Sequence, residues 1–240
     1  MSETAVCGSV SVLERDVVRN RQVSLNTVPI STGGPVTIGR DTELPVGIDP
    51  PDLGVSRRGV AVTAAADGWH VVIENRAGAF VHPWAQPPIW APHGTVAVHR
   101  WPKIGIRLIG SDRTMEHWVL LESEAYPLPV QGRSASADFG PTRLPPTPKP
   151  LTAHQLAAVQ GVFQEFLAWP PKSGPSPTTL ATAATKLKIS PAGVTERLAR
   201  VQDRAYALGM HRQTGVSDPA YLYLLVRHGF ITTPLPGTEH

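Results

Sequence analysis

The run VAVTAAADGWHVVIEN, residues 60–75, decides the fold class of the N-terminal half. Its two apolar parts, residues 60–63 and 69–74, flank Asp67-Gly68, a dipeptide typical of tight hairpin turns. Similar short runs, rich in Val, Ile and Trp and broken by Gly, Pro and Asp, occupy residues 35–39, 96–101, 104–109 and 118–122. Closely spaced short strands of this kind predict an all-β sandwich.

A proline-rich segment ends this pattern. Residues 127–150 hold seven of the 25 prolines in the 240-residue chain and few side chains that could fill a core. Such a composition is typical of a semi-extended linker. We therefore predict a sandwich over residues 1–126, a linker over 127–150 and a second domain over 151–240.

Beyond the linker the spacing of apolar residues becomes helical. Thr152 with Gln155 three positions later has the form of a capping box, and Ser190 followed by Pro191 is a typical helix start. Helices are expected near residues 152–166, 178–187, 191–208 and 218–229. Two of them joined by a turn of a few residues predict a small all-α (winged) helix-turn-helix domain.

Several classes of protein are excluded by what the sequence lacks. Cys7 is the single cysteine, so neither an internal disulfide framework nor a cysteine-based zinc site is expected. No run approaches the roughly 18 apolar residues of a membrane span, and the N-terminus does not have the form of a signal peptide. Paired carboxylates, a nucleophile with a base, metal-ligand spacings and cofactor motifs are absent. We expect a cytoplasmic protein that is not an enzyme and needs no metal or cofactor.

Three short motifs of the first half carry a resemblance to a known family. They are Ile38-Gly39-Arg40, Val55-Ser56-Arg57-Arg58 and Glu74-Asn75-Arg76-Ala77. Over residues 15–124 their order and spacing resemble the forkhead-associated (FHA) domain, whose motifs are Gly-Arg, Ser-Arg-x-His and Asn-Gly-Thr. The resemblance implies a sandwich of 11 strands that binds phosphothreonine peptides through loops at one end.

The resemblance also implies roles for individual residues. Arg40, Ser56 and Arg57 would contact the phosphate, and Asn75 would hydrogen-bond the peptide backbone beside it. A phosphate carries a charge of about −2 and three acceptor oxygens, so guanidinium groups and a hydroxyl suit it. Arg58 and Arg76 are further candidates in the same loops.

The chain departs from the family pattern at four positions. Gly59 stands where the family has a histidine that buttresses the binding loops. Glu74 would repel a nearby phosphate. Arg76 replaces the glycine and could offset Glu74 or add a phosphate contact, and Ala77 replaces the threonine. These departures favour an alternative function, a degenerate FHA fold that binds its partner independently of phosphate.

The helical half, with 8 basic against 5 acidic residues, resembles the small helix-turn-helix modules that follow FHA domains in actinobacterial regulators. Its N-terminal recognition positions, Pro191, Ala192 and Gly193, lack hydrogen-bonding side chains, so DNA is the less favoured partner and protein docking is at least as well supported. The candidate contacts to DNA or to a partner are Lys186, Lys188, Thr195, Arg197, Arg200 and Arg204.

Together these features predict a signalling adaptor downstream of a serine/threonine kinase. Its partner would be a phosphothreonine-containing protein or the kinase itself. A phosphorylation-responsive DNA-binding regulator is the other alternative. Thr142 and Thr147 in the linker are candidate phosphorylation sites.

Overall fold

A computed structural model describes residues 6–19, 21–128, 149–210 and 213–236. The chain divides between Pro127 and Leu128 into two compact units, which are taken separately below. The described part of the first unit forms eleven strands: β1 (Val6–Asp16), β2 (Arg21–Ser31), β3 (Pro35–Gly39), β4 (Leu44–Pro45), β5 (Val60–Ala65), β6 (Gly68–Ile73), β7 (Ala79–Pro83), β8 (Ile89–Ala91), β9 (Val96–His99), β10 (Lys103–Leu108) and β11 (Met115–Glu122).

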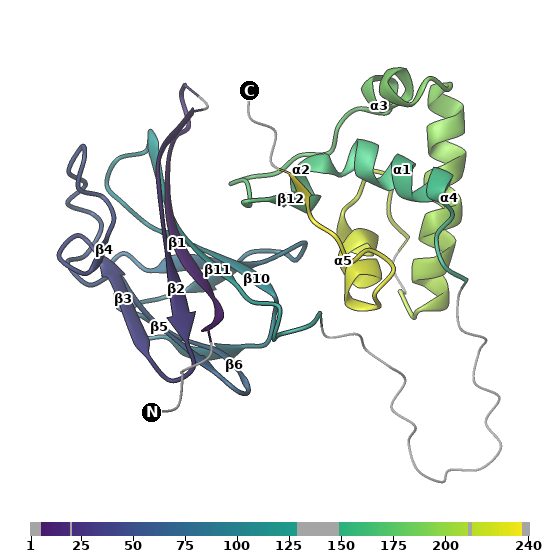
Figure 1. Ribbon diagram of the computed structural model, residues 1–240. Coiled ribbons are helices and arrows are strands. Elements are labelled where there is room, and N and C mark those ends of the chain that lie inside the picture. Colours follow the sequence, from purple (N-terminus) through teal and green to yellow (C-terminus); the bar gives the residue numbers. More distant parts are fainter. Residues whose placement is uncertain (1–5, 20, 129–148, 211–212, 237–240) are drawn as a thin grey trace, which may run out of the picture. The chain divides into compact units, whose positions relative to one another are not determined.

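The eleven strands form two sheets. The six-stranded sheet has the order β2-β1-β11-β10-β7-β8 and the five-stranded sheet the order β4-β3-β5-β6-β9. Figure 1 shows β1, β2, β10 and β11 in one layer and β3, β5 and β6 in the other. Neighbouring strands pair antiparallel, except for the short parallel pairing of β3 with β4. Antiparallel neighbours bring the end of one strand beside the start of the next, which matters for the loops described below.

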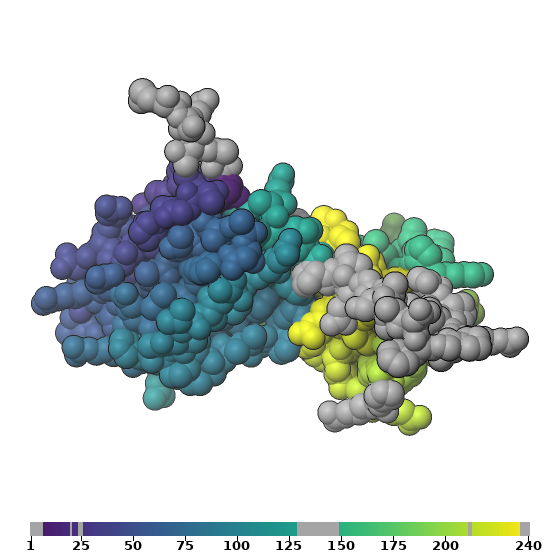
Figure 2. All heavy atoms as spheres, turned by 90° about the horizontal axis from the view of Figure 1, so that it is seen from below, coloured from purple at the N-terminus to yellow at the C-terminus, as the bar shows by residue number. Residues whose placement is uncertain are grey.

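The hydrophobic core lies between the sheets. Buried and half-buried residues alternate along β5, as expected for a strand with one face in a core. The fully buried side chains of the core include Val62, Trp69, Ile104 and Ile106. Figure 2 shows the outer surface of this unit, coloured purple to teal, in a space-filling view. The hairpin predicted at Asp67-Gly68 is present, because β5 and β6 pair in register on either side of it.

The second unit is mainly helical. Its elements are α1 (Ala153–Val162), α2 (Gln164–Leu167), β12 (Ala168–Trp169), α3 (Leu180–Leu187), α4 (Pro191–Ala207), α5 (Ala220–Arg227) and β13 (Leu235–Pro236). Thr152 and Gln155 form the predicted capping box at the start of α1. The core of this unit is built from one apolar face of each longer helix, with Val159, Leu198 and Tyr221 fully buried.

A turn of three residues joins α3 to α4. Lys188 adopts the left-handed conformation at the end of α3 (φ 53°), and the Ser190 hydroxyl accepts a hydrogen bond from Gly193 N–H at the start of α4. Pro191 occupies the first turn of α4, as the sequence predicts. The strands β12 and β13 pair in parallel with each other. Among the described residues, no β-hairpin that would form a wing follows α4.

The predicted fold class, a β-sandwich followed by a small helical domain, is confirmed. Within the described parts of the chain, no helix has the length and apolar character needed to cross a membrane.

Candidate functional site

The three motifs singled out in the sequence lie at one end of the sandwich. Arg40 follows the end of β3, residues 55–58 precede the start of β5, and Asn75 and Arg76 follow the end of β6. Since β3, β5 and β6 are antiparallel neighbours, these three positions lie at the same end of the five-stranded sheet. The topology alone therefore brings together the residues that the sequence could only place in order.

Backbone hydrogen bonds fix the loop after β3 against the loop before β5. Arg40 N–H donates to the Ser56 carbonyl (3.1 Å) and Asp41 N–H to the Arg57 carbonyl (3.0 Å). The Arg40 guanidinium also donates through Nε to the Val55 carbonyl (2.6 Å). A Cβ on Gly39 would lie 2.4 Å from the Arg57 carbonyl oxygen, so only glycine permits this approach.

Asn75 sits at the centre of this arrangement and is fully buried. Its Oδ1 accepts a hydrogen bond from Ser56 N–H (2.9 Å), and its Nδ2 donates to the Gly78 and Ile109 carbonyls (2.8 and 2.9 Å). Both amide protons are thereby used. The FHA resemblance implies that Asn75 contacts the peptide backbone, and in the structure the amide protons that it could donate are already used inside the protein. In the structure Asn75 instead holds three loops together.

Ser56, the residue expected to bind phosphate through its hydroxyl, is half-buried between these loops. Its Oγ accepts a hydrogen bond from Arg76 N–H (2.9 Å). A hydroxyl that accepts one bond still has its own proton to donate. The side chains of Arg57, the next residue of the same loop, and of Arg76, in the loop after β6, are both exposed, so the two loops present a hydroxyl together with two cations.

Arg58 behaves differently from the other arginines of these loops. Its Nε lies 3.0 Å from Glu74 Oε2, and its guanidinium also donates to Oε1 (3.3 Å). The sequence offered Arg76 as the cation that could offset the charge of Glu74, but in the structure Arg58 pairs with Glu74. The acidic side chain that departs from the family pattern is therefore balanced locally.

Gly59, which replaces the family histidine, is buried against the six-stranded sheet. A Cβ at this position would lie 2.9 Å from Leu108 Cδ1 and 3.2 Å from the Ile38 carbonyl oxygen. Its backbone receives Glu74 N–H (2.9 Å) and donates to Ile38 (2.7 Å). A side chain at position 59 would therefore require Leu108 to move.

A buried charged cluster that the sequence analysis missed lies behind the same loops. His117 on β11 contacts Glu14 on β1 through Nδ1 (2.9 Å) and Asp52 in the β4–β5 loop through Nε2 (3.0 Å). All three residues are buried: His117 is 1% exposed, Glu14 5% and Asp52 3%. They lie far apart in the chain and no local motif joins them. The one signal that could have found them is a charged or titratable residue inside an apolar strand, as Glu14 is in β1 and His117 in β11.

Burial raises the pKa of a carboxyl, yet that of Asp52 is held far below its usual range. The hydroxyl and N–H of Ser111 and the N–H groups of Asp112 and Gly54 donate to it and stabilise its charged form. For His117, burial favours the neutral ring, but hydrogen bonds from the ring to Glu14 and Asp52, and their charges, outweigh burial and raise its pKa above 6.5.

The candidate residues of the helical unit are mostly engaged within the protein. Arg200 pairs with Glu196 (2.6 Å), and Arg204 donates to the carbonyls of Lys149 (2.9 Å) and Arg200 (2.7 Å). Lys186 donates to Gln164, and the Thr195 hydroxyl donates to Pro191 O, while Arg197 is half-buried and Lys188 is exposed. Thr142 and Thr147 lie outside the described residues.

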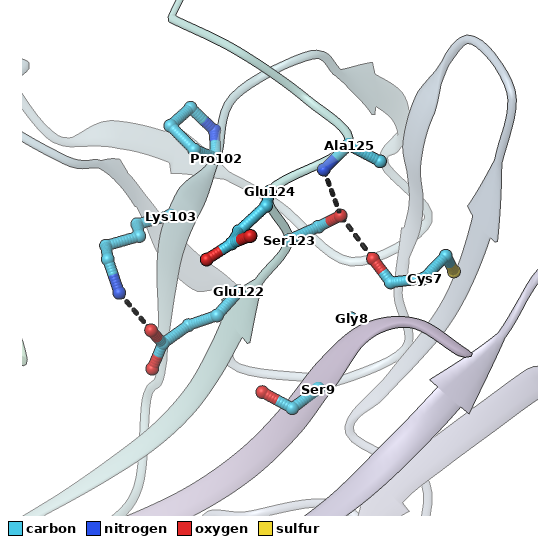
Figure 3. Close-up of a pocket in the computed structure, with 9 residues that line it drawn as sticks. All are labelled: Cys7, Gly8, Ser9, Pro102, Lys103, Glu122, Ser123, Glu124 and Ala125. Carbon is cyan, nitrogen blue, oxygen red and sulfur yellow. Dashed lines mark hydrogen bonds and ion pairs between the residues drawn. The ribbon is translucent and has the colours of Figure 1, made fainter. Parts of the chain in front are cut away.

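Figure 3 shows a separate hollow of about 520 Å³ in the sandwich. It is lined by the start of β1, the start of β10 and the end of β11, which is the opposite end of these strands from the 109–114 loop. Ser123 Oγ donates to the Cys7 carbonyl and accepts from Ala125 N–H (3.1 Å), and Lys103 pairs with Glu122. These bonds tie the ends of β1, β10 and β11 together. The hollow is separate from the loops that carry Arg40, Ser56 and Asn75.

Comparison with known proteins gives little further information. No family model matches the chain, and no curated protein matches it. A solved structure of the interferon regulatory factor 9 IAD domain is similar over 52% of this chain and 88% of that chain, with 11% identity and a TM-score of 0.34. A TM-score this low adds nothing to the fold assignment, which rests on the strand order of this chain.

Proposed function

We propose that the N-terminal sandwich binds phosphothreonine peptides and acts as an adaptor in serine/threonine kinase signalling. The observation that carries the proposal is the fixed placement of Arg40 and Ser56 against each other. Their loops are joined by the hydrogen bond from Arg40 N–H to Ser56 O, and Asn75 Oδ1 accepts a further bond from Ser56 N–H. The phosphate-binding groups that the FHA resemblance implies are therefore held in place by the backbone.

The chemistry of the loop surface suits a phosphate better than a carboxylate. A dianionic phosphate has three acceptor oxygens and binds best to several forked donors. Arg57 and Arg76 are exposed in the same loops as the Ser56 hydroxyl, and Arg40 lies beside them. The partner is accordingly a phosphorylated protein, either a kinase substrate or the kinase itself.

The pairing of Arg58 with Glu74 supports the same proposal. An uncompensated carboxylate beside the site would repel a phosphate, but this one is 3.0 Å from a guanidinium. The pair also explains how a chain with glutamate at this position can present a net positive surface there.

The test is a titration of the whole protein with a degenerate phosphothreonine peptide library and the same library without phosphate, followed by calorimetry on the selected sequences. Replacing Arg40 by Ala or Ser56 by Ala is expected to lower affinity about 10-fold to 150-fold, the value of a hydrogen bond to a charged group. Arg100→Ala is the matched control, since it removes an exposed arginine that follows β9 at the opposite end of the five-stranded sheet. It is expected to change affinity by less than about 3-fold.

Equal affinity for phosphorylated and unphosphorylated peptides would contradict the proposal and favour the phosphate-independent interaction module. Unchanged affinity in both the Arg40 and the Ser56 variant would place the binding surface elsewhere on the sandwich.

A further inference from the structure

The loop that carries Ser56 has little regular structure of its own. Between β4 and β5 it forms a single bridge, from Ile48 to Pro51. A loop of this length would be mobile and would order only on binding, at a cost to affinity. Arg40 and Asn75 hold Ser56 itself, but the stretch that leads up to it, residues 46–55, needs anchors of its own, and the family histidine is absent at Gly59.

The cluster of Glu14, His117 and Asp52 holds this loop at two points. Glu14 Oε1 accepts a hydrogen bond from Gly47 N–H (2.7 Å) at the start of the loop. Asp52 accepts from Gly54 N–H (2.8 Å), and the Asp52 carbonyl accepts from Val55 N–H (3.1 Å), directly before Ser56. The same carboxylate accepts three bonds from Ser111 and Asp112 in the β10–β11 loop.

His117 connects these two anchors. Its two ring nitrogens each lie within hydrogen-bond distance of a carboxylate oxygen. An ionised carboxylate only accepts hydrogen bonds, so both contacts are made only when both nitrogens carry a proton. The geometry thus calls for an imidazolium between two carboxylates. A neutral ring would lose one of the two bonds and leave two negative charges buried together.

We propose that Glu14, His117 and Asp52 take the place of the missing family histidine and position the Ser56 loop for phosphate, so that ligand affinity falls in alkaline solution as His117 loses its proton. This rests on the proposed function. The three residues act through the loop and not on the ligand, so they are positioning residues.

The groups that face His117 define the direction of the pH effect. Glu14 faces it from β1 and Asp52 from the β4–β5 loop, while β10 contributes the apolar Leu108 at the paired position. In the β10–β11 loop, Asp112 turns its carboxylate to Thr114. A pKa raised in the folded state means that the contribution of His117 to stability is complete below about 6.5 and is lost as pH rises through the folded value. Asp52, whose pKa is lowered, keeps its charge through this window.

The first test follows His117 directly by nitrogen-detected NMR of the full chain between pH 5 and 10. We expect a doubly protonated ring at neutral pH that titrates above 6.5. Glu14→Gln keeps an acceptor oxygen for Gly47 and His117 but removes a charge, so it should lower that titration midpoint. A ring that is singly protonated at pH 6.5, or a midpoint that the variant leaves unchanged, would overturn the proposal.

The second test measures the loop and the ligand. Hydrogen exchange over residues 46–56 should quicken about tenfold in His117→Gln relative to the wild-type protein. Phosphopeptide affinity, compared with that of His117→Gln at each pH, should fall about tenfold from below to above the NMR midpoint of His117. His70→Gln is the matched control, because His70 pairs with Asp67 (2.7 Å) in the turn at the opposite end of the same hairpin.

Unchanged loop exchange in a folded His117→Gln protein would overturn the positioning role, as would a pH profile that survives in this variant. If the wild-type protein binds no phosphopeptide, the proposed function fails. The NMR and exchange measurements then still decide whether the cluster anchors the loop.

Discussion

The chain carries arginines on two surfaces that look alike in the sequence and differ in the structure. In the sandwich, Arg57 and Arg76 stand exposed on loops that are locked by backbone bonds, and among the described residues neither guanidinium has a hydrogen-bond partner. On α4, Arg200 and Arg204 are bound to Glu196 and to backbone carbonyls. A count of charges would have ranked the helical unit as the basic one.

The difference shows that the usefulness of a cation for binding depends on what else it already contacts. An arginine paired within its own helix must give up that contact before it binds a phosphate, and the exchange gains little. An arginine presented by a rigid loop gives up nothing but water. The comparison favours the sandwich loops over α4 as the anion-binding surface, and three predictions test it.

The largest effect is expected from Asn75→Ala, which removes the side chain that joins the sandwich loops. Ser56 N–H and the carbonyls of Gly78 and Ile109 would each lose a buried partner. Each unsatisfied group costs about 1–3 kcal/mol, and since two of the three bonds are only partly buried, unfolding should become easier by about 3–5 kcal/mol. Urea denaturation followed by tryptophan fluorescence measures it. A loss below about 1 kcal/mol would show that the loops do not depend on Asn75.

A smaller loss of stability is expected from Gly59→His, which restores the residue typical of the FHA family. The new side chain would start 2.9 Å from Leu108 Cδ1, and overpacking of this kind costs about 1–3 kcal/mol. Gly34→His is the matched control, since its Cβ would meet nothing closer than the Ser31 carbonyl at 3.8 Å. Thermal unfolding of both variants decides the matter. A stabilised Gly59→His protein would mean that the loops lack a buttress and that the buried cluster does not supply one.

Several features of the fold could be predicted from the sequence. The hairpin at Asp67-Gly68, the strand-rich class and the caps at Thr152 and Ser190 follow from local patterns, and all are present. The gathering of Arg40, Ser56 and Asn75 at one end was implied by the resemblance of three short motifs to the FHA domain. In each case the information lies within a few residues or in a repeated spacing.

The roles of Asn75, Arg58 and the His117 cluster could not be obtained in this way. Glu14 and His117 are register partners on β1 and β11, so their contact depends on a pairing between the two ends of the unit. Arg58 meets Glu74 because β5 and β6 pair antiparallel. Such contacts are set by long-range topology, and an isolated Glu or His in a strand carries no mark of its partner.

The smallest effect concerns the other side of the comparison, the arginines of α4. Glu196→Ala breaks the pair with Arg200, and because the pair is exposed the stability should change by less than about 0.5 kcal/mol. Asp203→Ala removes the same charge further along α4 and leaves the pair intact. We expect neither the wild-type protein nor the Asp203 variant to bind mixed-sequence duplex DNA in fluorescence anisotropy at physiological salt, and the Glu196 variant to gain at most weak binding at low salt. The wild-type protein could instead bind DNA with an association constant whose logarithm falls with the logarithm of the salt concentration at a slope of about −3 or steeper. Such a slope would mean that several arginines leave their internal partners to bind phosphates. In that case the contacts of Arg200 and Arg204 would not be what separates α4 from the sandwich loops.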